Sequence, residues 1–212
     1  MLETKIVEWF EQNYKTKDAS HDLGHFRRVL KIARKINQEG KYDVCDDILI
    51  CASYFHDIVS LPKNHPERKE SSKLAAKKAE EILKENFSLE YSKIEKVKHA
   101  IEAHSFSANI QAKTIEAKII QDADRLEALG ALGIARCFYI SGKLENHLFD
   151  EDDFYADKRN LDDKKYAVDH FFVKLFKIEE LLNTKEAKKI AKEKNNFMKL
   201  FLEKLKEEVA FE

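Results

Sequence analysis

Apolar residues recur along most of the chain at the three- and four-residue intervals of amphipathic helices, and polar residues fill the positions between them. This pattern predicts helices at about residues 3–14, 23–38, 44–58, 67–86, 91–104, 115–140, 165–182 and 184–208. Gly40 is a good C-terminal stop for the second of them. Residues 143–165 are acidic and aromatic without a clean period, and we expect an irregular segment there. The pattern indicates no convincing strand, so we predict an all-α fold of about eight or more helices with no substantial sheet.

The segment at residues 115–140 differs from the others because it is apolar nearly all round. A helix of that kind is usually buried on every side, so we expect it to be a central element of the core. Gly130 and Gly133 lie inside it and would allow close contact with a neighbouring helix, although each weakens the helix slightly.

The composition agrees with a helical class and with one domain. The chain has 212 residues, of which only five are Gly and two are Pro, and this scarcity argues against a many-turned β fold. A chain of this length fits a single domain with a sizeable core. We therefore predict one domain over residues 1–212, with a motif-bearing core at about 20–140 and C-terminal helices at about 165–208 packed on it.

The net charge and the short apolar runs of the chain argue against nucleic acid and membranes as partners. Lys and Arg number 38 against 39 Asp and Glu, so the net charge of −1 gives no general attraction to nucleic acid. The chain has no apolar run near the roughly 20 residues that span a bilayer, and its N-terminus lacks a signal peptide's apolar stretch. Cys45, Cys51 and Cys137 lack CxxC spacing and read as reduced core residues. We expect a cytoplasmic protein with neither a membrane nor a nucleic-acid partner; a homodimer stays open.

Three candidate metal ligands, His25, His56 and Asp124, stand on helix faces that are otherwise apolar. Residues three, four and seven apart share a face, and at these spacings the neighbours of each candidate are mostly Val, Ile, Leu or Ala. A buried charge without a partner is costly, so such groups need a countercharge or a metal. A mixed set of imidazoles and carboxylates suits Mn, Fe, Mg, Zn or a similar divalent ion.

The order of these residues carries a resemblance to a known family. His25, then the dipeptide His56-Asp57, then Asp124 resembles the H…HD…D signature of the HD-domain superfamily of metal-dependent phosphohydrolases. The match is close to its small, single-domain bacterial branch, whose motifs are similar to residues 22–29, 56–66, 104–107 and 121–126. The resemblance implies the helical HD-domain fold.

By the same resemblance, His25, His56, Asp57 and Asp124 are the metal ligands. Asp122 competes with Asp124 because the segment Asp122-Ala123-Asp124 offers two carboxylates; the aspartate directly before Arg125 fits the family pattern better. We expect one divalent ion, with Mn or Mg favoured over Fe, Co, Ni or Zn. His99 and His104 are five residues apart, about 140° around a helix, which makes them a poor pair for a second metal.

Other residues near these motifs suit a phosphorylated substrate. Two prolines stiffen the loop after Asp57, and that loop carries Lys63 and, just beyond it, Arg68, which we expect to bind phosphate together with Arg28. His104 begins the segment at 104–107, and we expect it to contact the substrate or donate a proton. Four further residues are expected to support the metal ligands without binding the metal themselves: Asp122, His21, His65 and His99.

The function that these expectations describe is hydrolysis of a phosphate ester or anhydride, with Asp57 and His104 as catalytic residues. Because similar proteins act on nucleotides, the expected substrate is a nucleotide, cleaved as by a nucleotidase or a nucleoside triphosphate pyrophosphohydrolase. An alarmone hydrolase and a diiron oxygenase are alternatives within the same fold, and the oxygenase needs a second metal. A regulatory protein that binds a metal or nucleotide without turnover is the alternative from another class; its mark would be a damaged ligand set, and the four ligand positions are filled.

Overall fold

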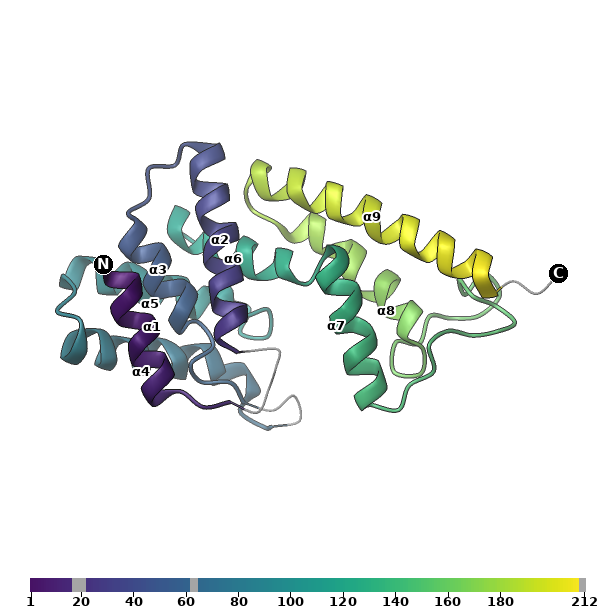
Figure 1. Cartoon of the computed structure of the whole chain (residues 1–212), viewed down its shortest axis with the longest axis horizontal. Coiled ribbons are helices and arrows are strands. Elements are labelled where there is room, and N and C mark those ends of the chain that lie inside the picture. The colour runs from purple at the N-terminus through teal and green to yellow at the C-terminus, as the bar shows by residue number, and fades with distance from the viewer. Residues whose placement is uncertain (17–21, 62–64, 210–212) are drawn as a thin grey trace. The chain divides into compact units, whose positions relative to one another are not determined.

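The computed structural model describes residues 1–16, 22–61 and 65–209. The chain divides into two compact units, Met1–Asp124 and Arg125–Glu212. Regular structure in the described residues is helical, as the sequence predicts, and the β-type pairing found there is an isolated bridge between His147 and Tyr166. Figure 1 shows the helices in chain order. The interpretation of residues 1–212 as one domain stays a prediction.

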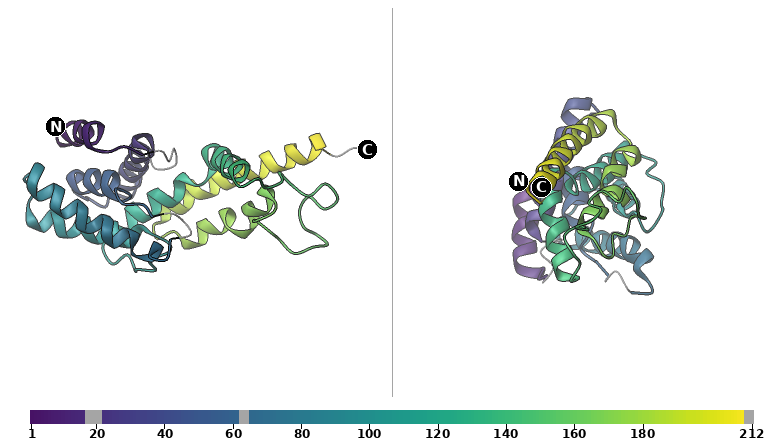
Figure 2. Two further views of the ribbon diagram at one scale, coloured as in Figure 1. Left: turned by 90° about the horizontal axis from the view of Figure 1, so that it is seen from below. Right: turned by 90° about the vertical axis from the view of Figure 1, so that its right-hand side faces the viewer.

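The first unit is built around α3. Its elements are α1 (Leu2–Asn13), α2 (Leu23–Gly40), α3 (Asp46–Phe55), η1 (Arg68–Glu70), α4 (Ser71–Asn86), α5 (Tyr91–His104) and most of α6 (Ile115–Glu127). Helix α3 contacts α1, α2, α4 and α5, and its residues 48–55 are all buried. Helices α4 and α5 lie side by side, which is clear in the left view of Figure 2. A helix that is surrounded in this way provides a rigid position for the residues that follow it.

An aromatic cluster joins the first three helices and reaches the end of α3. The Phe10 ring lies 5.4 Å from that of Phe26, 5.9 Å from that of Tyr54 and 5.0 Å from that of Phe55. All four side chains are almost completely buried. The Phe26 ring also lies 5.5 Å from the ring of His56 in an edge-on arrangement. These contacts fix the position of His56 from the core side.

The second unit contains α7 (Gly130–Lys143), α8 (Ala167–Val173), η2 (Leu175–Leu181) and α9 (Lys185–Val209). Helix α9 contacts α7 and η2, and α8 contacts α7 and η2. The predicted helix over 165–182 is therefore shorter than expected and divided, since Lys174 leaves helical geometry with φ −132° and ψ −56°. No described helix is long and apolar enough to cross a membrane.

The single long helix predicted for residues 115–140 is wrong. Helix α6 ends at Glu127 and α7 begins at Gly130, whose φ of +75° favours glycine. A Cβ on Gly133 would lie 2.1 Å from the carbonyl oxygen of Ala128, so this glycine gives space to the turn before α7. A Cβ on Gly130 would lie 3.1 Å from the Lys194 side chain of α9. The glycines thus permit a break between two helices, where we had expected an uninterrupted one.

Helix α2 ends at Gly40, as predicted, but the residue that terminates it is Lys41. Gly40 is the last helical residue, and Lys41 takes the left-handed conformation that terminates the helix, with φ 52°. The Lys41 backbone N–H donates to the carbonyls of Asn37 and Gln38, which closes the helix without a glycine at that position. The helix predicted for 44–58 ends earlier than expected, at Phe55. The helix predicted for 67–86 begins with the short helix η1.

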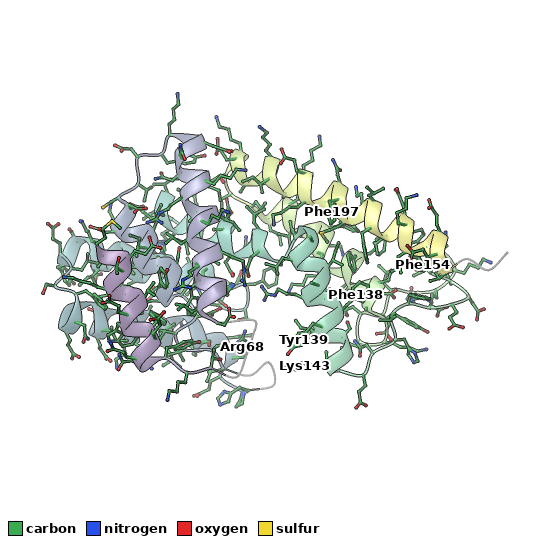
Figure 3. The ribbon with its side chains drawn as sticks, viewed as in Figure 1. Arg68, Phe138, Tyr139, Lys143, Phe154 and Phe197 are labelled. Carbon is green, nitrogen blue, oxygen red and sulfur yellow. The ribbon has the colours of Figure 1, made fainter. Side chains whose placement is uncertain are left out.

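The segment between α7 and α8 lacks regular helix, as predicted, and is held by ion pairs of Arg159. Arg159 donates to both carboxylate oxygens of Asp169, over 2.5 Å and 2.9 Å, and Asp169 is fully buried. Phe154, labelled in Figure 3, is buried and lies 5.3 Å from the Phe149 ring. Asp153 accepts backbone hydrogen bonds from residues 157 and 158. The acidic and aromatic side chains of this segment therefore serve its own folding.

Candidate metal centre

Helix α2 begins in a way that places His25 in its first turn. The Asp22 carboxylate caps the helix by accepting the backbone N–H of His25 at 2.8 Å. Gly24 leaves space on the same turn, because a Cβ there would lie 3.0 Å from Arg28 Nη1 and 3.1 Å from Asp22 Oδ1. The His25 side chain is 2% exposed. A helix start that is fixed by its own cap thus carries one buried imidazole and, three residues later, a cation.

His56 follows directly after α3 and has a defined tautomer. Its Nδ1 lies 2.8 Å from the Ser53 carbonyl oxygen. Because a carbonyl only accepts, Nδ1 carries the proton and Nε2 keeps its lone pair. Burial lowers the pKa of His56 to about 4, although the nearby Asp57 opposes the shift. The ring is therefore neutral near pH 7, the state in which imidazole binds metals.

The donor atoms of the four predicted metal ligands lie close to one another. His25 Nε2 lies 3.0 Å from His56 Nε2. Asp124 Oδ1 is 3.7 Å from the first nitrogen and 3.8 Å from the second. Asp57 Oδ2 is 4.0 Å from His25 Nε2 and 3.5 Å from His56 Nε2. These residues come from α2, the end of α3 and α6, so the first unit assembles the group from three separate segments.

The spacing of these atoms fits a divalent ion. For donors about 2.1 Å from an ion, adjacent donors stand about 3.0 Å apart and opposite ones about 4.2 Å apart. Five of the six distances between these four atoms run from 3.0 to 4.0 Å. The atoms of His25, His56 and Asp124 form one donor set, and Asp57 stands in a second set with His56 and His104. Two imidazole nitrogens with two carboxylate oxygens also form a donor set that such ions accept. The Asp57 and Asp124 side chains are 17% and 27% exposed, so the group is open to solvent on the carboxylate side.

His104 joins this group through Asp57. It is the last residue of α5, its Nδ1 donates to the Ile101 carbonyl at 2.6 Å, and its Nε2 lies 3.4 Å from Asp57 Oδ1. Burial lowers its pKa, but the hydrogen bond and charge of Asp57 outweigh burial, and the net shift is upward. Asp57 Oδ2 thus faces the His25 and His56 imidazoles, and Oδ1 faces His104. His56, Asp57 and His104 form a second possible donor set that shares His56 with the first.

His99 lies apart from this arrangement. Its Nε2 accepts a hydrogen bond from the backbone N–H of Lys113 at 3.0 Å, which holds the segment before α6. His99 belongs to neither of the donor sets found in the described residues. That His99 and His104 do not hold a second metal together stays a prediction. The contact between His104 and Asp57 was not predicted.

The two aspartates of the DxD segment have different surroundings. Asp124 contributes to the first donor set, together with His25 and His56. Asp122 is completely buried and belongs to neither donor set in the described residues. The preference for Asp124 as the fourth ligand, with Asp122 in a supporting position, stays a prediction that this geometry favours.

The loop after Asp57 is held by side chains from the segment that follows it. Arg68, labelled in Figure 3, donates through Nη1 to the Leu61 carbonyl and lies 3.4 Å from Ser60 Oγ. The Ser71 hydroxyl donates to the Val59 carbonyl at 3.1 Å. Arg68 thus has a structural task in addition to the phosphate contact predicted for it. His65 Nδ1 accepts the backbone N–H of Glu67 at 3.1 Å. Lys63 and His21 lie outside the described residues.

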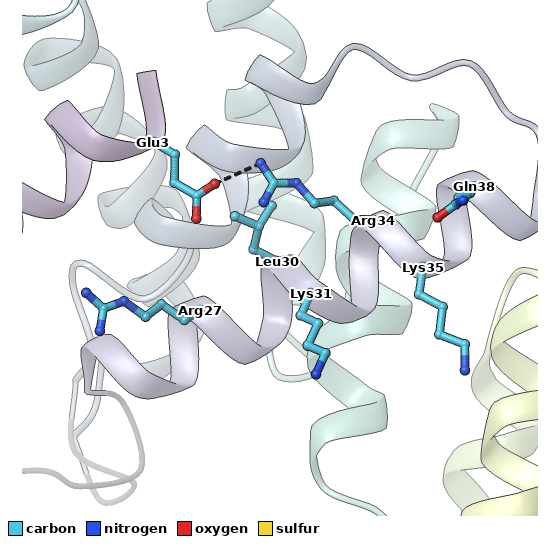
Figure 4. A pocket seen from close by; sticks show the side chains of 7 residues that line it. All are labelled: Glu3, Arg27, Leu30, Lys31, Arg34, Lys35 and Gln38. Atoms are coloured by element: carbon cyan, nitrogen blue, oxygen red, sulfur yellow. Dashed lines mark ion pairs between the residues drawn. The ribbon is translucent and has the colours of Figure 1, made fainter. Parts of the chain in front are cut away.

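A separate cleft of about 410 Å³ lies on the exposed face of α2. Figure 4 shows its seven lining side chains, none of which belongs to the donor sets. Arg34 in this cleft pairs with Glu3 at 2.8 Å and with both oxygens of Asp46, at 2.8 and 2.7 Å. The charge of Arg34 is therefore already balanced by carboxylates, and the cleft makes a weaker candidate site than the two histidine and aspartate donor sets.

The supports of the two imidazoles were missed by the sequence analysis. His56 and His104 each donate to the carbonyl three residues earlier, that of Ser53 and that of Ile101. A signal for both was present, because each histidine stands at or just after the end of a helix, where carbonyls lack intrahelical partners. A histidine at such a position has a ready acceptor for Nδ1 and therefore presents Nε2.

The family model described as HD domain matches residues 22–129, just over half of the chain. The chain belongs to the HD domain family. The matched span contains every residue of the two donor sets, which are His25, His56, Asp57, His104 and Asp124. The predicted family and fold are confirmed by this match and by the solved structures that resemble the chain.

Relatives align with the chain over nearly its whole length. YpgQ of Bacillus subtilis (strain 168) is 29% identical over 210 residues, which cover 97% of this chain and 92% of YpgQ. An HD-superfamily hydrolase from Bacillus thuringiensis is 29% identical with a TM-score of 0.71, covering 99% of this chain and 96% of that one. The crystal structure of YpgQ in complex with ADP is 27% identical with a TM-score of 0.70, covering 98% of this chain and 97% of that one.

Proposed function

We propose that this protein is a metal-dependent phosphohydrolase that cleaves a phosphate ester or anhydride of a nucleotide. The observation that carries the proposal is the convergence of His25, His56 and Asp124 donor atoms, with Asp57 between His56 and His104. The resemblance to an HD-superfamily hydrolase supports the reaction class. The ADP complex of YpgQ supports a nucleotide as the substrate.

In this proposal His25, His56, Asp57 and Asp124 hold one divalent ion. Such an ion, when bound, acts as a Lewis acid toward phosphate oxygens and lowers the pKa of water. The tautomer of His56 suits this role, because its Nδ1 is engaged with the Ser53 carbonyl and its Nε2 is free of a proton. Asp57 has one oxygen toward the two imidazoles of the donor set and one toward His104.

The chemistry that these residues perform is the attack of water on phosphorus and the departure of the leaving oxygen. Asp57 orients the attacking water and accepts its hydrogen bond. His104 Nε2 is the atom from which a proton passes to the leaving oxygen, while its Nδ1 stays bonded to the Ile101 carbonyl. The water oxygen bonds to phosphorus as the phosphorus–oxygen bond to the leaving group breaks, and the proton that the water loses passes to solvent, from which His104 is protonated again. Cleavage of an ester or a terminal anhydride gives inorganic phosphate and the dephosphorylated partner, and cleavage between the α- and β-phosphates of a triphosphate gives pyrophosphate and a nucleoside monophosphate.

Cationic side chains complete the proposed site. Arg28 stands one helical turn after His25, where it can donate to phosphate oxygens, and Lys63 and Arg68 are proposed for the same task. Since Arg68 also donates to the Leu61 carbonyl, its loss would disturb the loop as well as the phosphate contact.

A nucleotide panel tests the proposal. Nucleoside mono-, di- and triphosphates would be incubated with Mn, Mg, Co or Ni, and the products identified by chromatography. We expect metal-dependent turnover that is abolished in Asp57→Ala and retained in Asp47→Ala, a half-buried α3 aspartate paired with Lys93 at 2.7 Å. Circular dichroism would establish that both variants keep the fold. Turnover that persists in Asp57→Ala, or after complete chelation, would contradict this mechanism.

A further inference from the structure

The end of α5, which carries His104, lacks the usual backbone closure of a helix. Its C-cap, Ser105, is extended, with φ −69° and ψ 128°, and no left-handed residue follows to satisfy the last carbonyls. A helix leaves its final carbonyls without intrahelical partners, and leaving such groups unsatisfied in a buried place is costly. Other groups must therefore stabilise this helix end.

Three successive carbonyls at this end each accept a hydrogen bond from a buried side chain. His104 Nδ1 donates to the Ile101 carbonyl at 2.6 Å. The Ser72 hydroxyl of α4 donates to the Glu102 carbonyl at 3.0 Å, and Gln121 Nε2 of α6 donates to the Ala103 carbonyl at 2.6 Å. Ser72 is 2% exposed and Gln121 is 6% exposed. The helix end is thus held by side chains of α4 and α6 at once.

The two donors stand next to parts of the proposed site. Ser72 directly follows Ser71, whose hydroxyl holds the loop after Asp57. Gln121 lies three residues before Asp124 on α6, a spacing that puts the two on neighbouring positions of one helix surface. Fraying of the last turn of α5 would move the His104 ring away from Asp57 Oδ1, which lies 3.4 Å from its Nε2.

We propose that Ser72 and Gln121 are positioning residues that hold the last turn of α5 and thereby aim His104 at Asp57. They touch neither substrate nor metal, and they act through the Glu102 and Ala103 carbonyls. For its kinetic consequence the inference rests on the proposed function, in which His104 protonates the leaving oxygen. For the orientation of the ring it stands on the hydrogen bonds alone.

Two variants remove one donor each. Ser72→Ala deletes the hydroxyl, and Gln121→Met replaces the amide by a side chain of similar length without a donor. In each we expect kcat to fall about tenfold, as is typical when a supporting hydrogen bond is removed, with KM unchanged. Ser72→Thr retains a hydroxyl and should restore kcat. Asn86→Leu is the matched control, since Asn86 Nδ2 donates to the Ile82 carbonyl at 3.1 Å near the end of α4.

The proton on His104 Nδ1 provides a readout that needs no turnover. In metal-free wild-type protein at neutral pH this proton, bonded to the Ile101 carbonyl, should give a slowly exchanging NMR signal, assigned by its loss in His104→Gln. We expect the signal to disappear or broaden in Ser72→Ala and Gln121→Met and to persist in Asn86→Leu. If either donor variant fails to fold, the other decides.

The outcomes separate the two proposals. An unchanged signal and unchanged kcat in a folded Ser72→Ala or Gln121→Met would overturn the positioning role, and so would an equal loss in Asn86→Leu. A wild-type protein that turns over no nucleotide would instead overturn the proposed function. The NMR comparison would then still decide whether Ser72 and Gln121 hold the His104 ring.

Discussion

Exchanging each aspartate of the DxD segment for asparagine tests which one binds the metal. Asp124→Asn and Asp122→Asn are nearly isosteric, and each removes one negative charge. Asp124 Oδ1 lies 3.7 Å and 3.8 Å from the imidazole nitrogens of the donor set, whereas Asp122 is fully buried outside it. We therefore expect the metal affinity to depend on Asp124 and to be little changed by Asp122→Asn.

The size of the effect follows from the charge that is removed. Even two unit charges about 4 Å apart interact by about 4 kcal/mol at an effective dielectric constant of about 20, and this is a lower bound for a carboxylate in contact with a divalent ion. Loss of the Asp124 charge should thus weaken metal binding by at least roughly 1000-fold. At a metal concentration about 100 times the wild-type Kd, binding stabilises the folded protein by about 2.7 kcal/mol. For a chain of this length that free energy corresponds to a rise in Tm of about 5–11 °C.

Thermal unfolding with and without Mn, supported by calorimetric titration, measures this directly. Wild-type protein and Asp122→Asn should show the rise in Tm, while Asp124→Asn should show almost none at the same metal concentration. The metal-free Tm of each variant serves as its own reference, so a general loss of stability in Asp122→Asn does not disturb the comparison. A retained rise in Asp124→Asn together with a lost rise in Asp122→Asn would refute the assignment.

Three further predictions concern the metal-free protein, the break before α7 and the number of metals. Burial lowers the pKa of His56 from 6.5 to about 4, so between these pH values the unfolded chain binds more protons than the folded one. The free energy of unfolding of the metal-free protein should therefore fall by on the order of 3 kcal/mol as pH falls through that window. Denaturant titrations from pH 7 to 4 should show a weaker pH dependence of this free energy in His56→Gln, and an equal dependence in both proteins would count against the burial. Gly133→Ala puts a Cβ 2.1 Å from the Ala128 carbonyl oxygen and should lower the free energy of unfolding by about 2 kcal/mol. In Gly142→Ala the added Cβ meets nothing within 4 Å, and this variant should be as stable as the wild type or up to about 1 kcal/mol more stable. Equal unfolding free energies of the two variants would contradict this prediction. Elemental analysis of dialysed protein should give a metal-to-protein ratio near one. A ratio near two would favour the two-metal alternative, in which Asp57 and His104 contribute to a second ion while His56 binds the first.

The sequence predicts the helices well where an amphipathic period is long and its ends carry clear signals. The bounds expected for residues 91–104 agree with α5, and the candidate ligands His25 and His56 are buried as their apolar neighbours suggest. The break between α6 and α7 could not be read in this way. It depends on the positive φ of Gly130 and on the space that Gly133 gives to the Ala128 carbonyl, and a uniformly apolar segment hides both.

The candidate site was predicted as a set of residues, and its connections were not. His25 and His56 are 31 positions apart in sequence, and only the packing of α2 on α3 shows that their Nε2 atoms lie 3.0 Å apart. The contact of His104 with Asp57 and the bonds from Ser72 and Gln121 also join different helices. Contacts of this kind follow from tertiary packing, which no single-helix pattern contains.

Anomalous diffraction from crystals grown with Mn tests the central claim most directly. We predict one strong peak within coordination distance, about 2.0–2.3 Å, of His25 Nε2, His56 Nε2 and carboxylate oxygens of Asp57 and Asp124. A well-ordered cluster with no peak among these four side chains, or a peak held by other residues, would contradict the account.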